Sequence, residues 1–161
     1  MTQINAVKLL KEDHKAVKEL FDQFEKAKDA SKKAQIARKS IEELKIHDAI
    51  EEEIFYPAVR PAIEEENVMN EADEEHHMVR IAIAELDKMS DGDDRFEAKF
   101  TVLSEMVRHH IKEEESDMLP EAQKSDIDME ELGQQMQARK EELKSQGVPP
   151  TKEMAMVGSG E

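Results

Sequence analysis

The chain has 161 residues, a length typical of one domain. Charged residues make up 39% of it and aromatic residues 4%, which is typical of a water-soluble helical protein. The absence of cysteine excludes disulfides and thiolate metal sites, and the net charge of −16 argues against nucleic acid as a partner, because phosphates require a basic face. No apolar run approaches the ~20 residues that span a bilayer, and no signal peptide is visible, so we expect a cytoplasmic protein with no membrane partner.

The first long segment, residues 4–28, has apolar residues three and four positions apart, which places them on one face of an amphipathic helix. His14 lies in the middle of this stripe, which comprises Val7, Leu10, His14, Val17, Phe21 and Phe24. We expect a turn at residues 29–31, with Ser31 as the cap of the next helix.

The second segment, residues 32–56, carries a histidine and a glutamate on its core-facing stripe. The stripe is Ile41, Leu44, His47, Glu51, Ile54 and Ala58. Pro57 and Pro61 are expected to weaken or end this helix, because proline lacks an N–H and clashes with the preceding turn.

The third and fourth segments repeat this design. Residues 68–89 form a stripe with one histidine, His76, and the turn-forming residues 90–93 follow. Residues 94–119 form a stripe that contains both His110 and Glu114, and Pro120 is expected to end that helix.

A fifth segment, residues 128–145, carries no histidine and is expected to pack across the other helices as a lid or outer helix. No alternating pattern typical of strands is present. The sequence therefore predicts an all-α, up-down-up-down four-helix bundle over residues 1–120, an additional C-terminal helix within residues 121–146, and a disordered tail over residues 147–161.

The two halves of the chain share one motif. His47 is followed by a glutamate four positions later and by a proline ten positions later, and His110 has the same followers at Glu114 and Pro120. The stripe histidines are separated by 33 residues in the first half (47 − 14) and by 34 in the second (110 − 76). A pseudo-twofold pairing of the halves would bring four histidines and two glutamates together inside the bundle.

A shared cation explains these six residues together. A single histidine on an apolar stripe is usually a hydrogen-bonded core residue, but an unpaired buried carboxylate costs several kcal/mol. A purely structural bundle therefore leaves Glu51 and Glu114 unexplained. Imidazole and carboxylate ligands without thiolate suit iron or manganese, and zinc is the third option.

Neighbouring polar residues were assigned by stripe position. His109 forms a stripe of its own, one residue out of phase with that of His110. Pro120 follows His110 by ten residues, as Pro57 follows His47, and this match selects His110 as the ligand. His77 and His109 are therefore interpreted as surface or supporting groups. Asp13, Asp48 and Glu75 flank stripe histidines and could orient imidazoles, although a solvated acid is the simpler interpretation of each.

The order of these motifs resembles the hemerythrin-like, or His-His-Glu cation-binding, domain over roughly residues 5–120. The resemblance implies a four-helix bundle with a non-haem di-iron centre, in preference to manganese or zinc, whose two carboxylates bridge the ions. The ligands carried over are His14, His47, Glu51, His76, His110 and Glu114. Residues 121–145 resemble the extra C-terminal helix of some bacterial and mycobacterial relatives.

One departure concerns the third helix, where oxygen-carrying hemerythrins have two histidines four apart. Here the positions four residues from His76 hold Ala72 and Arg80, and the gap could be filled by water, by Asp73 or by another carboxylate. The resemblance implies a protein that binds or reacts with dioxygen, peroxide or nitric oxide in the oxidative or nitrosative stress response. The alternatives are a catalase-like enzyme that decomposes hydrogen peroxide and a non-catalytic iron or oxygen sensor or metal buffer. A monomer is compatible with the sequence.

Overall fold

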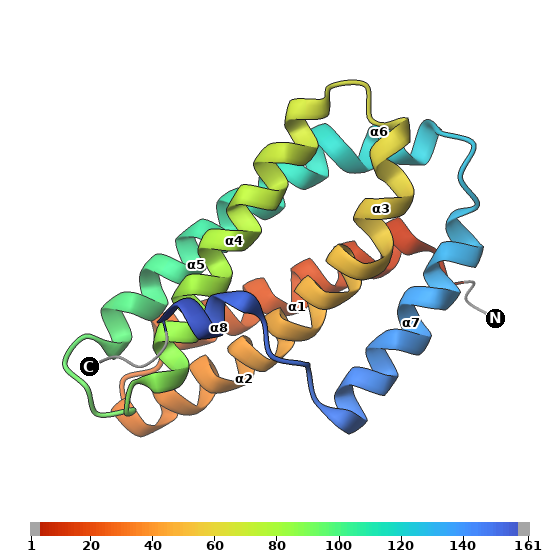
Figure 1. Ribbon diagram of the computed structural model, residues 1–161. Helices are drawn as coiled ribbons and strands as arrows, with labels where there is room; N and C mark the ends of the chain where they lie inside the picture. Colours follow the sequence, from red (N-terminus) through yellow and green to blue (C-terminus); the bar gives the residue numbers. More distant parts are fainter. Residues whose placement is uncertain (1–3, 158–161) are drawn as a thin grey trace.

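Four long helices form the body of the molecule (Figure 1). The computed structural model describes residues 4–157, and within that range the chain is helical and contains no strand. The bundle helices are α1 (Ala6–Lys26), α2 (Ala30–Ile50), α4 (Glu66–Lys88) and α5 (Phe96–Glu113). The prediction of an all-α four-helix bundle is confirmed.

Side-chain caps fix where several helices begin. The Asn5 side chain accepts hydrogen bonds from the backbone N–H groups of Val7 and Lys8 at the start of α1. The cap of α2 is Asp29, which accepts from the N–H of Lys32, so the expectation that Ser31 would cap this helix was wrong. Asp29 wins because its carboxylate can reach an N–H three residues later, whereas Ser31 already lies within the first turn.

Pro120 does not end its helix, contrary to the sequence prediction. Pro57 and Pro61 were expected to weaken or end the second helix, and the helical run is irregular before Pro57 and ends at Ala62, just after Pro61. The run of α2 continues through a π-helical turn, η1 (Glu51–Phe55), then α3 (Tyr56–Val59) and a 3₁₀ turn, η2 (Arg60–Ala62). The run of α5 continues through η3 (Glu114–Met118), also π-helical, and α6 (Leu119–Lys124). The residue before each proline donates its N–H to the glutamate carbonyl five residues earlier. This wider turn accommodates the proline ring, which would clash in a regular α-helix.

An additional helix, α7 (Met129–Gln146), packs across α1 and α2 on one side of the bundle (Figure 1). It begins at the cap Asp128. Gly133 allows α7 to approach the start of α1 closely, because a Cβ there would lie 2.8 Å from the backbone nitrogen of Ala6.

The predicted disordered tail contains a short helix, α8 (Lys152–Val157), which packs against α4 (Figure 1). The chain turns at Gly147, whose φ of 86° suits glycine, and then returns to the bundle. Glu153 explains why this polar segment is ordered: it is 1% exposed and pairs with His77 and Arg80 of α4. Residues 1–3 of the predicted bundle and 158–161 of the predicted tail lie outside the described residues.

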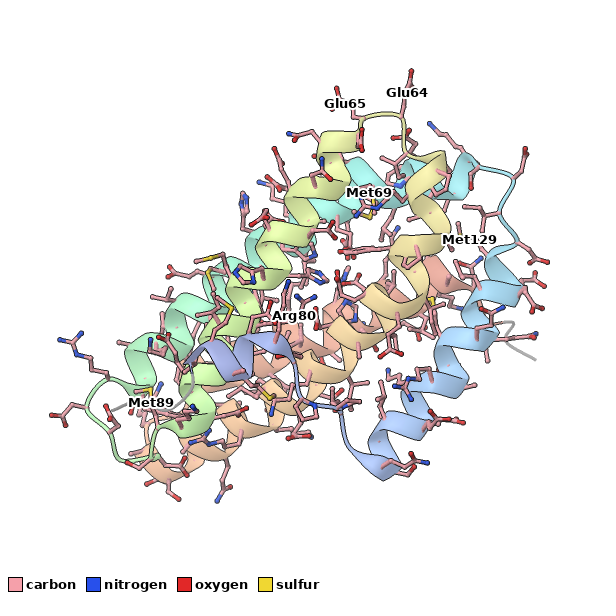
Figure 2. All side chains as sticks on the ribbon, viewed as in Figure 1. Glu64, Glu65, Met69, Arg80, Met89 and Met129 are labelled. Carbon is pink, nitrogen blue, oxygen red and sulfur yellow. The ribbon has the colours of Figure 1, made fainter. Side chains whose placement is uncertain are left out.

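Two apolar clusters fill the interior, and a polar layer separates them. One cluster includes Leu10, Met69 and Met118, near α3, α6 and α7, and the other includes Val17, Phe100 and Val107 at the opposite end. Figure 2 shows Met69 near the first end and Arg80 beside the middle of the bundle. Among the helices of the described part of the chain, none has the length and apolar character needed to cross a bilayer.

Candidate metal centre

The six predicted ligands meet in the polar layer between the two apolar clusters. Each bundle helix contributes at least one of them, because the stripe position that would otherwise hold an apolar residue holds a histidine or a glutamate. Glu51 is 0% exposed and Glu114 2% exposed, and the most accessible of the six is His47, whose side chain is 15% exposed. Both glutamates are the first residues of the π-helical turns described above.

The six side chains divide into two groups of four that share the two glutamates. His14 and His47 form the first group with Glu51 and Glu114, and His76 and His110 form the second with the same carboxylates. The potential ligand atoms of each group lie within 4.8 Å of one another. A pair of carboxylates common to two histidine pairs is the arrangement expected for two bridged ions.

The Nε2 atoms point at the shared carboxylates. Nε2 of His14 lies 3.1 Å from Oε1 of Glu114, and Nε2 of His47 lies 3.3 Å from Oε1 of Glu51. In the second group the corresponding distances are 3.2 Å from His76 to Glu51 and 3.1 Å from His110 to Glu114. Each group thus presents two nitrogens and two carboxylates to one small volume.

The other ring nitrogen of each histidine faces a second carboxylate. The Nδ1 of His14 donates to Glu115 at 2.7 Å and the Nδ1 of His47 to Asp13 at 3.0 Å. A carboxylate on Nδ1 fixes the ring orientation and leaves Nε2 free to bind a metal.

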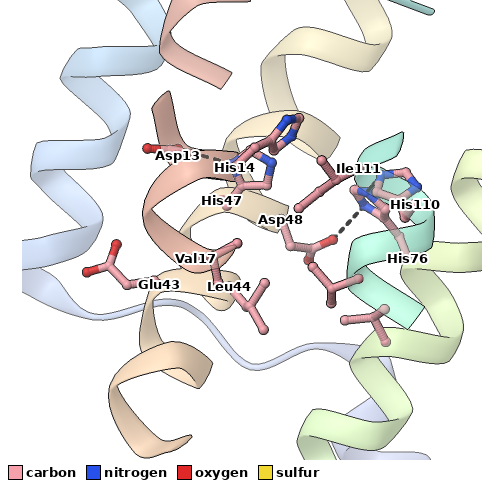
Figure 3. Close-up of a pocket in the computed structure, with 12 residues that line it drawn as sticks. Asp13, His14, Val17, Glu43, Leu44, His47, Asp48, His76, His110 and Ile111 are labelled. Carbon is pink, nitrogen blue, oxygen red and sulfur yellow. Dashed lines mark hydrogen bonds and ion pairs between the residues drawn. The ribbon is translucent and has the colours of Figure 1, made fainter. Parts of the chain in front are cut away.

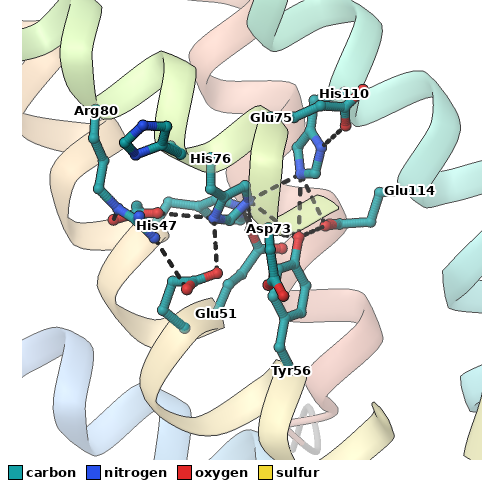
Figure 4. A network of polar contacts seen from close by, with 12 residues as sticks. His47, Glu51, Tyr56, Asp73, Glu75, His76, Arg80, His110 and Glu114 are labelled. Atoms are coloured by element: carbon teal, nitrogen blue, oxygen red, sulfur yellow. Dashed lines mark hydrogen bonds and ion pairs between the residues drawn. The ribbon is translucent and has the colours of Figure 1, made fainter. Parts of the chain in front are cut away.

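The second histidine pair is held in the same way. The Nδ1 of His76 lies 2.8 Å from Asp48, and that of His110 donates to Glu75 at 2.6 Å (Figure 4). Asp13, Asp48 and Glu75 therefore do orient imidazoles, but each one serves a histidine on another helix and not the histidine beside it in the sequence. Helix packing determines that choice, so local sequence could not reveal it.

Charged side chains outside the centre hold two of these carboxylates. Lys140 of α7 donates to Asp13 at 2.5 Å, and Arg80 donates through Nε to Asp48 at 2.9 Å. Burial raises the pKa of Asp13, but its hydrogen bonds with His47 and Lys140 lower it to about 2. These acids are therefore ionised at neutral pH and favour a positive charge at the centre.

In the metal-free centre, His47, His76 and His110 have raised pKa values. Burial alone lowers the pKa of His110, but hydrogen bonds with Glu114 and Glu75 raise it to about 9. Burial also lowers the pKa of His47 and of His76. Glu51, together with Asp13 at His47 and Asp48 at His76, outweighs burial and raises both pKa values well above the usual value. Burial raises the pKa of Glu114, yet the hydrogen bond from His110 brings it well below its usual range. The centre therefore stabilises cationic charge.

Several buried ligand atoms lack hydrogen-bond partners within residues 4–157: His14 Nε2, His47 Nε2, Glu51 Oε2 and Glu114 Oε1. An unsatisfied buried polar atom costs ~1–3 kcal/mol, and more when it is charged. A cation bound between these atoms removes that cost. The donor set, nitrogen and carboxylate oxygen without sulfur, also fits a first-row transition metal. The residues present therefore fit a metal centre.

Tyr56 is a seventh member of the centre, and sequence analysis missed it. Its hydroxyl donates to Glu114 Oε2 at 2.5 Å and lies 3.1 Å from His76 Nε2 and 3.2 Å from His110 Nε2 (Figure 4). Burial and the charge of Glu114 raise the pKa of this phenol well above 10. One signal was available: it is the only tyrosine in the chain and directly precedes the proline of the first motif.

The remaining polar candidates lie outside the cluster. Asp73, considered as a replacement for the missing histidine, pairs with Arg60 at 2.5 Å, and its side chain is 41% exposed. His77 pairs with Glu153, and the side chain of His109 is 64% exposed. The place next to the second histidine pair is therefore taken by Tyr56 and not by Asp73.

A mostly apolar cavity, which Tyr56 does not line, adjoins the centre (Figure 3). The four histidines border one end, and apolar side chains supply most of the remaining surface: Val17, Leu44, Val79, Val107 and Ile111. Asp13, Glu43 and Asp48 also contribute to the lining. A water-sized sphere can place its centre in about 40 Å³ of this space. The cavity is large enough for a molecule of two or three heavy atoms and offers it few hydrogen-bond partners beyond the imidazoles.

The sequence was compared with known protein families and solved structures. The family model described as the Hemerythrin HHE cation binding domain matches residues 5–122. The fold matches the crystal structure of a Hemerythrin HHE cation binding domain-containing protein, the Rv2633c homolog from Mycobacterium kansasii. That alignment has a TM-score of 0.73 and 27% identity, and it covers 95% of this chain and 98% of the other.

Two curated relatives are similar in sequence to this chain over different shares of their own length. The uncharacterized protein Rv2633c of Mycobacterium tuberculosis is 29% identical over 145 residues, which is 88% of each chain. A protein named DNA nickase from Nostoc is 26% identical over 113 residues, covering 70% of this chain. This chain matches only 32% of the length of the Nostoc protein, so the likeness concerns one part of that larger protein.

Proposed function

The chain belongs to the hemerythrin HHE cation-binding domain family, and we propose that it is a non-haem di-iron protein that binds or reacts with dioxygen, peroxide or nitric oxide in the oxidative or nitrosative stress response. The observation that carries the proposal is the pair of histidine pairs around two shared buried glutamates. Two bound iron ions would supply reversible electron exchange and coordination positions for a small ligand.

The protein supplies the remaining features. The Nδ1 carboxylates hold the four imidazoles with Nε2 turned inward, and the π-helical turns bring both glutamates to the same layer. The apolar cavity excludes most water beside the centre, which favours weakly hydrated ligands such as dioxygen and nitric oxide over ions. The Tyr56 hydroxyl keeps one proton within hydrogen-bond reach of the second histidine pair.

Metal analysis with an optical spectrum tests this proposal. The purified protein should contain about two irons per chain and show an absorption band in the near ultraviolet. Glu51→Ala and His110→Ala should lose both, whereas His109→Ala, at an exposed histidine outside the cluster, should keep them. A metal-free protein that stays folded and cannot be loaded with iron would overturn the proposal.

A catalase-like activity is the second candidate, and the position of Tyr56 favours it. Peroxide decomposition requires proton movement between peroxide oxygens, and the phenol lies close to both ligands of the second pair while staying protonated at neutral pH. Iron-loaded protein should evolve oxygen from hydrogen peroxide, and Tyr56→Phe should slow evolution at unchanged iron content. Turnover no greater than that of free iron would contradict this candidate.

A further inference from the structure

A second group of nitrogen and carboxylate ligands lies on the outer face of the bundle. Nε2 of His109 is 3.0 Å from Oε1 of Glu113, one turn later on α5, and 3.7 Å from Oε2 of Glu75 on α4. The three side chains offer ligand atoms within 4.8 Å of one another and, unlike the inner centre, they are accessible to solvent.

A small acidic cavity shares Glu75 and Glu113 with this outer group, although His109 does not line it, and reaches the inner centre. Glu71 and Asp117 are exposed at its rim, Glu75 and Glu113 are half-buried below them, and His110 and Glu114 close its inner end. The centre of a water-sized sphere can occupy about 20 Å³ of it, roughly the space of one water molecule. Its lining contains no lysine or arginine.

The inner end of this cavity has an unsatisfied acceptor. Glu114 is 2% exposed, and its Oε1 accepts no hydrogen bond from the described residues. Acidic side chains therefore lead from an exposed rim to the buried carboxylate of Glu114, and Val68, Ala72 and Met118 complete the lining. A cleft lined by charge of one sign concentrates the opposite ion and raises its rate of association.

Glu75 links the outer group to the centre directly. One of its carboxylate oxygens accepts from the Nδ1 of His110 at 2.6 Å, while the other faces His109. A cation held by the outer oxygen would thus be one side chain away from an inner ligand. Two other openings contain cationic side chains: one is lined by Arg60, Arg80 and Lys152 as well as acids, and another contains Lys8, Lys11 and Lys15. The groove that His109 and Glu75 border on the outer face is lined by Met78, Val102 and Met106 as well as acids, and it does not include His110 or Glu114.

We propose that Glu75, His109 and Glu113 form an outer cation site, where a divalent transition metal ion binds before it passes through the acidic cavity to Glu114 and His110. The inference rests on the proposed function in that the inner centre is the destination of the ion. One imidazole with two carboxylates suits Fe²⁺, Mn²⁺ or Zn²⁺ better than Mg²⁺, which prefers oxygen and water. The apolar cavity then serves the small ligand, and the acidic cavity serves the metal.

Loading kinetics with Co²⁺ as the probe test the proposal. Metal-free full-length protein is mixed with Co²⁺ in a stopped-flow instrument, and the cobalt absorption band reports occupancy of the inner centre. In His109→Asn and Glu113→Gln, Co²⁺ should enter the inner centre about tenfold more slowly, which is the lower end of electrostatic steering effects. The final occupancy of the inner centre should be the same as in the unaltered chain. Their loading rates should also depend less on salt than that of the unaltered chain.

Glu43→Gln is the matched control, because it removes one acidic charge beside the apolar cavity instead. It should load at the unaltered rate. Wild-type loading rates in both His109→Asn and Glu113→Gln would overturn the outer site, and so would an equal slowing in Glu43→Gln.

A separate measurement distinguishes failure of the outer site from failure of the inner one. In Glu51→Gln, which is expected to lose the inner centre, substoichiometric Co²⁺ should still shift the proton resonances of the His109 ring. In the unaltered chain, a shifted His109 with no loading of the inner centre would refute the proposed function alone. An unshifted His109 in Glu51→Gln would refute the outer site, whatever the inner centre does.

Discussion

Filling the metal-free centre should release protons, because a metal can bind only to a deprotonated imidazole. The pKa of His110 is about 9 in the metal-free chain, where burial is outweighed by the hydrogen bonds with Glu114 and Glu75. At pH 7 the imidazolium therefore exceeds the neutral ring by about 100-fold, and deprotonation costs about 2.7 kcal/mol at 1.36 kcal/mol per pH unit. The pKa values of His47 and His76 are also raised, so their rings too must lose a proton before they bind a metal.

We expect about three protons to be released per chain at pH 7 and the apparent metal affinity to rise with pH. Each proton contributes about tenfold in affinity per pH unit while its histidine remains charged. The stability of the metal-free chain changes in the opposite direction. The raised pKa of His110 contributes stability that is fully present below its ordinary pKa of 6.5 and is lost as the pH rises through about 9.

Titration of metal-free protein with Zn²⁺ in a weakly buffered solution containing a pH indicator measures this release. Calorimetry in two buffers with different ionisation enthalpies gives the same number independently. His109→Asn should release as many protons as the unaltered chain, because its exposed ring is outside the inner centre. A release below one proton per chain at pH 7 would show that the inner imidazoles are neutral and would refute the reasoning.

Three further substitutions test the surroundings of the centre. Asp13→Asn should weaken metal binding about tenfold in a chelator competition assay, which is the low end for loss of an orienting partner. The amide oxygen can still accept from His47, but the negative charge of the carboxylate is lost. Glu153→Gln should lower the stability of the docked α8 by about 1.5–3 kcal/mol and speed proteolysis after Gly147, whereas the exposed Glu141→Gln should not. Gly133→Ala should lower the free energy of unfolding in urea by about 1–3 kcal/mol, because the added Cβ would meet backbone atoms at 2.8 and 2.9 Å. Gly92→Ala is the control: a Cβ there has open space, so the free energy of unfolding should hardly change.

The bundle and the gathering of the six side chains could be predicted from the sequence because both depend on one periodicity. A helix repeat of 3.6 residues places His47 and Glu51 on the same face as the apolar residues, and burial forces that face inward. Periodicity alone left His109 as an alternative, and the distance to Pro120 selected His110; the two side chains are 9% (His110) and 64% (His109) exposed.

The errors arose where an interaction crossed between helices or changed the helix itself. A π-helical turn has no clear local signature, so Pro120 was expected to end a helix that continues past it through a wider turn. The order of α8 depends on Glu153 reaching His77 and Arg80, more than 70 residues earlier in the chain. The pairing of Glu153 with His77 and Arg80 could not be predicted from the composition of the tail.

The centre is most informative where its two halves differ. Glu51 and Glu114 open equivalent π-helical turns, and the residue five positions later, before each proline, is Tyr56 in one half and Leu119 in the other. Leu119 joins the apolar cluster, whereas the Tyr56 hydroxyl crosses to the glutamate of the opposite half and to the second histidine pair. The two histidine pairs therefore share the same two carboxylates but differ in one protein hydroxyl. The acidic cavity also ends at His110 and Glu114, on the side that holds the tyrosine. Under the proposed functions, the second histidine pair would combine the Tyr56 proton with access for a cation, while the apolar cavity, bordered by all four histidines, would admit a small ligand to both pairs.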